Sequence, residues 1–187
     1  MALLEAILVL DREVLLAING MAGNDFIDGL MLLLSSKLVW IPLYLFILYT
    51  ILVHFGFKKG TWVVLGSVVL VILTDQSTVL LFKDIFSRPR PCHLNDLKEL
   101  LILKDDRCGG SFGFISSHAA NITGLATYWY LLFKKLNRFW ALLIIWPILV
   151  SYSRIHLGVH YPTDVLVGAL FGMCVSMLIY RLTVKAL

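Results

Sequence analysis

The amino-acid sequence predicts an all-α protein, a polytopic bundle of transmembrane helices in which residues 1–187 form a single domain. Hydrophobic residues make up 59% of the chain and charged residues 15%, and the mean hydropathy is +0.87. This composition disfavours a domain surrounded by water. The apolar residues stand in long unbroken runs, which are typical of membrane-spanning helices, whereas a membrane barrel would show short alternating strands.

Five apolar segments are long enough to cross a bilayer, because about 20 apolar residues span its hydrocarbon core as a helix. We expect these spans at residues 31–53, 61–82, 118–133, 138–153 and 163–180. Pro147 is expected to kink the fourth span, since proline cannot donate a helical hydrogen bond.

Residues 1–20 predict a helix that lies in the membrane interface. Leu3, Leu4 and Leu8 fall on one side of this helix, and charges follow at residues 11–13. A sixth, imperfect span is the alternative. The stretch lacks the basic start of a cleavable signal peptide.

The distribution of charge predicts how the bundle is oriented. Five spans place residues 54–60, 134–137 and 181–187 on one side, and residues 1–30, 83–117 and 154–162 on the other. The first side and its borders carry basic residues and no acidic one: Lys58, Lys59, Lys134, Lys135, Arg138, Arg181 and Lys185. Basic connections mark the cytoplasmic face. We therefore expect the connection 83–117 to face the periplasm or exterior of a bacterial inner membrane.

The cysteines leave two possibilities open. Cys92 and Cys108 lie in the outward connection, where a disulfide would stabilise the loop by about 3 kcal/mol; two free thiols are the alternative. Cys174 falls within the fifth span. The sequence contains neither a CxxC pair nor a carboxylate cluster, so we expect no metal and no other cofactor.

Three stretches at the outward ends of spans carry groups suited to phosphate chemistry. They are KDIFSRPRP with Lys83, Arg88 and Arg90, FISSHAAN with Ser116, Ser117 and His118, and SRIHLGVHYPTD with Arg154, His156, His160 and Asp164. A single charge at the end of a span is ordinarily an interfacial anchor. Several basic groups, histidines and a carboxylate on one side of the bundle instead predict a shared site.

The spacing of these residues resembles the type 2 phosphatidic acid phosphatase family, which includes membrane lipid phosphatases and soluble vanadium haloperoxidases. The resemblance covers residues 75–170 and rests on Lys83, six residues and Arg90-Pro91, on Ser116-x-His118, and on Ser153-Arg154, five residues, His160, three residues and Asp164. In the middle motif Ile115 and Ser117 replace the proline and glycine of the family's Pro-Ser-Gly-His. The five expected spans favour the membrane phosphatases over the haloperoxidases.

Phosphate chemistry assigns a role to each of these residues. A phosphate monoester and its transition state are strongly anionic, and guanidinium forks and an ammonium group hold such charge. The predicted phosphate-binding residues are Lys83, Arg90, Ser116, Ser117 and Arg154. Amide groups in the first turn of the third span would face the same anion.

Two histidines are predicted to carry the reaction. Asp164 lies four residues after His160 and can hold one imidazole N–H while the other nitrogen attacks phosphorus. The resemblance implies the same assignment, with a phosphohistidine intermediate, and His118 as general acid and then general base. Arg88 misses the motif spacing and is expected to orient the loop, whereas His156 and Asp75 are expected to be structural.

The sequence thus predicts a metal-independent hydrolase whose partners are the bilayer and a phosphorylated lipid, and not nucleic acid. The candidate substrates are lipid A 1-phosphate, undecaprenyl diphosphate, phosphatidylglycerol phosphate and phosphatidic acid. A phosphotransferase that uses the same phosphohistidine is the main alternative. A channel or anion-binding protein would need neither the two histidines nor the matched aspartate. The oligomeric state stays open.

Overall fold

The computed structural model describes residues 2–103 and 108–187. These residues form helices joined by turns, and their strand-like pairing is limited to an isolated bridge between Pro89 and Phe112. Residues 104–107 of the predicted outward connection, with two of its carboxylates, lie outside the described residues.

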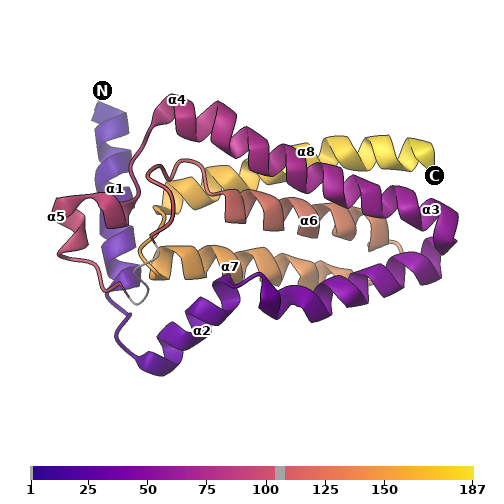
Figure 1. Cartoon of the computed structure of the whole chain (residues 1–187), viewed down its shortest axis with the longest axis horizontal. Coiled ribbons are helices and arrows are strands. Elements are labelled where there is room, and N and C mark those ends of the chain that lie inside the picture. The colour runs from indigo at the N-terminus through magenta and orange to yellow at the C-terminus, as the bar shows by residue number, and fades with distance from the viewer. Residues whose placement is uncertain (1, 104–107) are drawn as a thin grey trace.

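The bundle is built from helices that run side by side along its long axis (Figure 1): α3 (Ile41–Ser77), α6 (Ser117–Phe133), α7 (Ile145–His156) and α8 (Pro162–Ala186). Helix α3 bends back on itself at Gly56, whose φ of 70° favours glycine. Among residues 2–103 and 108–187, three helical stretches are long and apolar enough to cross a membrane: Leu38–Phe86, Arg138–His156 and Pro162–Ala186. The two arms of α3 correspond to the first and second expected spans, and α6 corresponds to the third. The number of membrane crossings stays a prediction.

The first expected span, 31–53, is wrong at its start. Helix α2 (Asp25–Ser35) ends there, Ser36 is extended with φ −76° and ψ 133°, and a new helical stretch begins with η1 (Leu38–Trp40). The Ser36 hydroxyl accepts the amide of Leu38 at 3.4 Å, a local hydrogen bond that competes with helix continuation.

Pro147 lies close to a change of helix type, and the predicted kink itself stays a prediction. Residues Arg138–Ile144 form a 3₁₀-helix, η4, and α7 begins after it at Ile145. Pro147 therefore lies in the first turn of a new helix, where its missing N–H matters least.

Helix α8 approaches α6 closely because two glycines face it. A Cβ on Gly168 would lie 2.6 Å from the carbonyl oxygen of Ser116, and one on Gly172 would clash with that of Ala120. Small residues spaced by four are typical of close helix contacts in membranes. The contact is completed by a 2.9 Å hydrogen bond from the Ser116 amide to the Asp164 carbonyl, which joins the starts of the two helices.

Helix α1 (Ala2–Asn19) runs across one end of the bundle rather than along it (Figure 1). Leu3 and Leu4 are 77% and 63% exposed, whereas Leu15 is buried. The Asn19 amide donates to the His156 carbonyl at 2.8 Å and to the Ile102 carbonyl at 3.1 Å. Helix α1 is thus anchored to the end of the bundle, and its position in a membrane interface stays a prediction.

The remaining short elements gather at the same end as α1. They are η2 (Thr78–Lys83), a π-helical turn, α4 (Asp84–Phe86), η3 (Pro91–His93) and α5 (Asn95–Lys98). The bend of α3, the α6 to η4 connection and the C-terminus lie at the opposite end (Figure 1). The predicted division of the connections is thus a division between two ends of the bundle, while their orientation in a membrane stays a prediction.

Candidate active site

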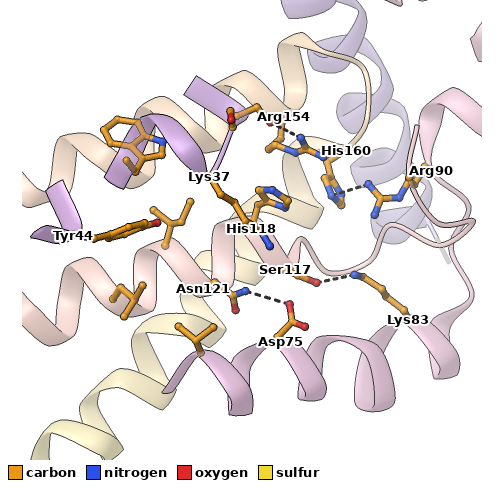
Figure 2. Close-up of a pocket in the computed structure, with 17 residues that line it drawn as sticks. Lys37, Tyr44, Asp75, Lys83, Arg90, Ser117, His118, Asn121, Arg154 and His160 are labelled. Carbon is orange, nitrogen blue, oxygen red and sulfur yellow. Dashed lines mark hydrogen bonds between the residues drawn. The ribbon is translucent and has the colours of Figure 1, made fainter. Parts of the chain in front are cut away.

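A cavity of about 470 Å³ opens beside the α1 end of the bundle. All three predicted stretches contribute to its wall, through Lys83, Arg90, Ser117, His118, Arg154 and His160. Figure 2 shows these side chains approaching one space from several helices and from the connections between them. Apolar side chains continue the wall away from the charged groups: Trp40, Tyr44, Val71, Ile122 and Leu125.

His160 lies in the turn between α7 and α8, and 1% of its surface is exposed. Its Nε2 atom is 3.1 Å from Nη1 of Arg90, and its Nδ1 atom is 3.4 Å from Oδ2 of Asp164. A guanidinium group can only donate, so Nε2 accepts and Nδ1 carries the proton that Asp164 accepts. Burial, followed by the positive charges of Arg90 and Arg154, lowers the pKa of His160 well below 6.5. The imidazole is therefore neutral.

Asp164 occupies the first turn of α8, as its distance from Pro162 predicts. Its Oδ2 atom accepts the amide of Tyr161 at 3.0 Å in addition to the His160 ring. Its Oδ1 atom accepts Nη1 of Arg88 at 2.9 Å. Hydrogen bonds thus hold both carboxylate oxygens.

Two adjacent serines at the start of α6 have different surroundings. Ser116 is 0% exposed and caps the helix, since its hydroxyl accepts the Ala119 amide at 3.4 Å. Ser117 faces the cavity, and its hydroxyl accepts a hydrogen bond from the Lys83 ammonium group at 2.7 Å. Of the two serines predicted to bind phosphate, Ser117 therefore faces the cavity, whereas Ser116 is buried in the helix cap.

Cations surround His160 on the cavity side. The Arg90 amide donates to the Ser111 carbonyl at 3.1 Å, which fixes the backbone that carries this guanidinium. Burial lowers the pKa of Arg90, and the Asp164 charge opposes that change. Arg154 donates to the Ser35 hydroxyl at 2.5 Å. The Nε atoms of Arg90 and Arg154 are buried and have no hydrogen-bond partner among the described residues.

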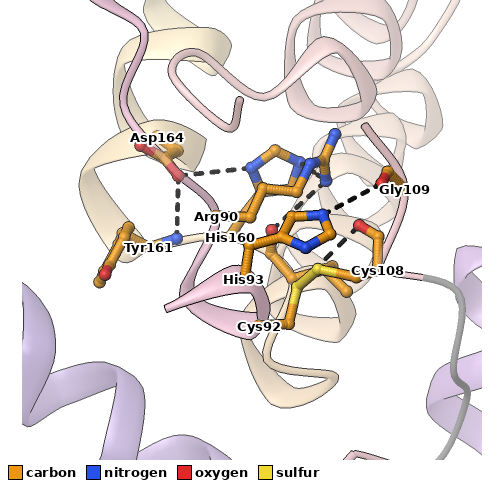
Figure 3. Close-up of a disulfide and its surroundings, with 9 residues drawn as sticks. Arg90, Cys92, His93, Cys108, Gly109, His160, Tyr161 and Asp164 are labelled. Atoms are coloured by element: carbon orange, nitrogen blue, oxygen red, sulfur yellow. Dashed lines mark hydrogen bonds and ion pairs between the residues drawn. A yellow bond between two sulfur atoms is a disulfide. The ribbon is translucent and has the colours of Figure 1, made fainter. Parts of the chain in front are cut away.

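A disulfide closes the loop beside these cations. Cys92 and Cys108 are bonded to each other (Figure 3), which settles the choice that the sequence left open. Gly109 follows Cys108 and lies against the guanidinium of Arg90, where an added Cβ would be 3.5 Å from Cζ. The disulfide therefore holds the cavity rim next to Arg90.

Residues that the sequence discounted have defined contacts. The His156 ring is 3.0 Å from Asp28 and is buried, as expected for a structural histidine. Asp75 accepts a hydrogen bond from the side-chain amide of Asn121 at 3.2 Å and also lines the cavity. Arg88, which the sequence predicts to orient its loop, forms an ion pair with Asp164 at 2.9 Å.

Sequence reasoning missed two charged residues. Lys37 lines the cavity from the break after α2, and Asp11 is 2% exposed beside Arg88. Neither belongs to a motif with fixed spacing. The polar interruption at Ser35-Ser36-Lys37 within an apolar run was the available signal for Lys37, whereas Asp11 has none beyond a charge on an amphipathic helix.

Comparison with known proteins places this geometry in a family. The family model of the PAP2 superfamily matches residues 61–187. A lipid A 4'-phosphatase of Bacteroides thetaiotaomicron is 35% identical over 165 residues, 87% of this chain and 72% of that protein. A lipid A 4'-phosphatase of Porphyromonas gingivalis is 31% identical over 185 residues, 98% of this chain and 77% of that protein. An undecaprenyl-diphosphatase of Sulfolobus acidocaldarius is 33% identical over 160 residues, 81% of this chain and 68% of that protein.

Two solved structures share the fold. A transmembrane PAP2-type phosphatidylglycerolphosphate phosphatase from Bacillus subtilis superposes with a TM-score of 0.72 at 20% identity, over 96% of this chain and 87% of that chain. Aquifex aeolicus LpxE superposes with a TM-score of 0.60 at 26% identity, over 90% of this chain and 93% of that chain. The resemblance read from the three motifs is confirmed, and this chain belongs to the PAP2 superfamily.

Proposed function

We propose that this protein is a membrane lipid phosphatase that removes phosphate through a covalent phosphohistidine on His160. One observation carries the proposal: Nε2 of His160 is an unprotonated nitrogen beside a cavity lined by Lys83, Arg90 and Arg154. Asp164 holds the opposite nitrogen of the same ring. This arrangement provides a neutral nucleophile next to groups that bind an anion.

The first step forms a phosphorus–nitrogen bond at Nε2 as the phosphorus–oxygen bond to the lipid breaks. The cations and the Ser117 hydroxyl stabilise charge on the phosphoryl oxygens. His118 gives a proton to the departing oxygen. In the second step His118 takes a proton from water, the water oxygen attacks phosphorus, and Nε2 leaves. Two inversions give overall retention at phosphorus.

Lipid A is the proposed substrate class. The two relatives named lipid A 4'-phosphatases, 35% and 31% identical, favour the 4'-phosphate over the 1-phosphate, which is among the candidates predicted from the sequence. The apolar wall at Trp40, Tyr44 and Leu125 suits a lipid whose tails stay in the bilayer. Undecaprenyl diphosphate is the second candidate, supported by the Sulfolobus relative. Phosphatidylglycerol phosphate and phosphatidic acid are the remaining candidate substrates.

The site is proposed to act at the outer face of the inner membrane and without a metal ion. Basic residues at the opposite end of the bundle support this orientation. Cations at the cavity wall supply the charge that a metal would otherwise provide. Phosphotransfer to an acceptor hydroxyl would use the same intermediate and remains the alternative activity.

The test is release of phosphate by the detergent-solubilised protein from lipid A, its 1- and 4'-monophosphates, undecaprenyl diphosphate and phosphatidic acid. His160→Ala should abolish release, and a chelator should leave it unchanged. His54 lies in α3 beside the bend at Gly56, at the opposite end of the bundle (Figure 1), so His54→Ala should preserve release. Release from none of these lipids would refute the function, and full activity of His160→Ala would refute the nucleophile. Transfer of labelled phosphate to a lipid, with little free phosphate, would identify a phosphotransferase.

A further inference from the structure

We propose that Asp11, on the N-terminal helix α1, is a positioning residue for the reaction. It holds Arg88, which in turn holds Asp164 beside His160. The inference rests on the proposed function, because it concerns the orientation of the proposed nucleophile. Asp11 precedes residues 61–187, the part of the chain matched by the family model, so this contribution comes from a separate segment.

Asp11 is buried where α1 crosses the start of α8. One carboxylate oxygen, Oδ1, accepts the Thr163 amide at 2.8 Å. The other, Oδ2, accepts Nη2 of Arg88 at 2.7 Å and the Thr163 hydroxyl at 2.5 Å. A negative charge is favourable at the first turn of a helix, where amide groups lack helical partners. Asp11 therefore binds both the start of α8 and the side chain of Arg88.

Arg88 is held on several sides. Its Nη1 donates to Oδ1 of Asp164 at 2.9 Å and to the Thr163 hydroxyl at 2.8 Å, while Nη2 reaches Asp11. Its Cζ also lies 3.9 Å from the centroid of the Tyr161 ring, a cation–π contact. The guanidinium is thus fixed in plane and direction between two carboxylates that are 0% exposed at their side chains.

These contacts form a chain from Asp11 through Arg88 and Asp164 to His160. Arg88 contacts Oδ1 of Asp164, and the His160 ring contacts Oδ2. Loss of Asp11 would free the guanidinium to turn and would leave its charge concentrated on Asp164. The carboxylate could then rotate away from the imidazole. A displacement of about 1 Å at a reacting group can reduce the rate by about 100-fold.

Helix α1 has anchors that do not involve Asp11. Leu15 packs in a cluster with Leu97, Tyr161 and Val165, and Asn19 binds the carbonyls of Ile102 and His156. A substitution at Asp11 should therefore leave α1 in place. This separates a positioning role from a general role in folding.

The test compares Asp11→Asn with Arg12→Gln in the full-length protein. Arg12 is the next residue along α1 and pairs with Asp96 at 2.8 Å on the exposed side, so its substitution removes an α1 contact without touching Arg88. With the preferred lipid of the substrate panel, Asp11→Asn should lower kcat by about 10- to 100-fold while KM changes less than about twofold. Arg12→Gln should retain kcat, and the thermal unfolding midpoints should agree.

A double-mutant cycle identifies the route through Arg88. Asp11→Asn should have little further effect on kcat in an Arg88→Gln background, because residues in one network are not additive. Wild-type kcat in Asp11→Asn, or an equal loss in both backgrounds, would overturn the proposal. The proposal would also be overturned if the fraction of unfolded protein accounted for the whole loss of kcat. If Asp11→Asn cannot be purified folded, Arg88→Lys replaces it and should lower kcat with KM unchanged; an unchanged kcat would refute the proposal.

The outcome is distinguishable from failure of the proposed function. An inactive wild-type protein, or an active His160→Ala, counts against the phosphohistidine mechanism. An active wild type, an inactive His160→Ala and a fully active Asp11→Asn would refute the role of Asp11 alone.

Discussion

The two walls of the cavity differ in how their polar atoms are paired. On the α7 to α8 side, His160 and Asp164 are almost fully buried, and each ring nitrogen and carboxylate oxygen has a partner. On the α3 to α6 side, Lys83 and Ser117 are half-buried and face the cavity. The difference teaches that the proposed nucleophile is fixed before substrate arrives, whereas groups facing it can exchange their present partners for phosphate oxygens.

Substitution of the most constrained group should have the largest effect. Asp164→Asn replaces an acceptor with an amide that can donate to Nδ1 of His160, so the ring proton would move to Nε2. An analogous change in a catalytic triad costs about 10⁴-fold in kcat, and we expect a loss of that order in lipid phosphate release. A loss of less than about tenfold would show that Asp164 does not set the tautomer.

Loss of a cation from the cavity wall should have a smaller effect. Arg154→Ala should lower kcat about 10²- to 10³-fold, because one charge-stabilising donor is removed. The kcat of Arg154→Lys should lie between those of the wild type and Arg154→Ala, since lysine keeps the charge and loses the planar guanidinium fork. Ser35→Ala removes the hydroxyl that Arg154 contacts and is the matched control, with a small expected change. Equal losses in all three variants would indicate a structural effect.

The cavity rim should respond mainly in stability. Replacement of Cys92 and Cys108 by serine should lower the free energy of unfolding by about 3 kcal/mol, because the unfolded chain regains the freedom of the loop. Activity should decline modestly as the segment beside Arg90 loosens. Reduction should add the mass of two hydrogens. Unchanged thermal unfolding in the serine variant would contradict the stabilising role.

The pH response should be the smallest effect near neutrality. The pKa of His160 is lowered well below 6.5, so its ring should stay neutral as the pH falls from 7.5 to 6.0, whereas a histidine with a pKa of 6.5 would be about three-quarters protonated at pH 6.0. Its unfolded form would bind a proton first, so stability should fall as the pH drops below about 6.5. Nitrogen-15 NMR of labelled histidines, with His160→Ala for assignment, gives the midpoint. A midpoint near 6.5 would contradict the assigned burial.

The sequence predicted the main helices well and the breaks between them less well. Long apolar runs located both ends of α6 and the start of α8 within one residue, because hydrophobic length is a strong local signal. The predicted span 31–53 concealed the break at Ser36, where one hydroxyl competes with a helical hydrogen bond. Such a choice depends on a small difference in local energy.

Motif spacing by itself determined which residues would meet. Lys83, Arg90, His118, Arg154 and His160 line one cavity because each motif lies at the same end of a helix or in the connection beside it. The alternation of spans brings such ends together, whatever the details of packing. The composition likewise determined that the chain would form a helical membrane bundle.

Only the tertiary structure decided how these residues are held. It placed Ser117 at the cavity and Ser116 in a helix cap, and it joined Cys92 to Cys108. It also brought Asp11 to Arg88, 77 positions away. The physical reason is that side-chain direction and long-range contact depend on how helices pack against one another, and no periodicity or spacing in the chain records that packing.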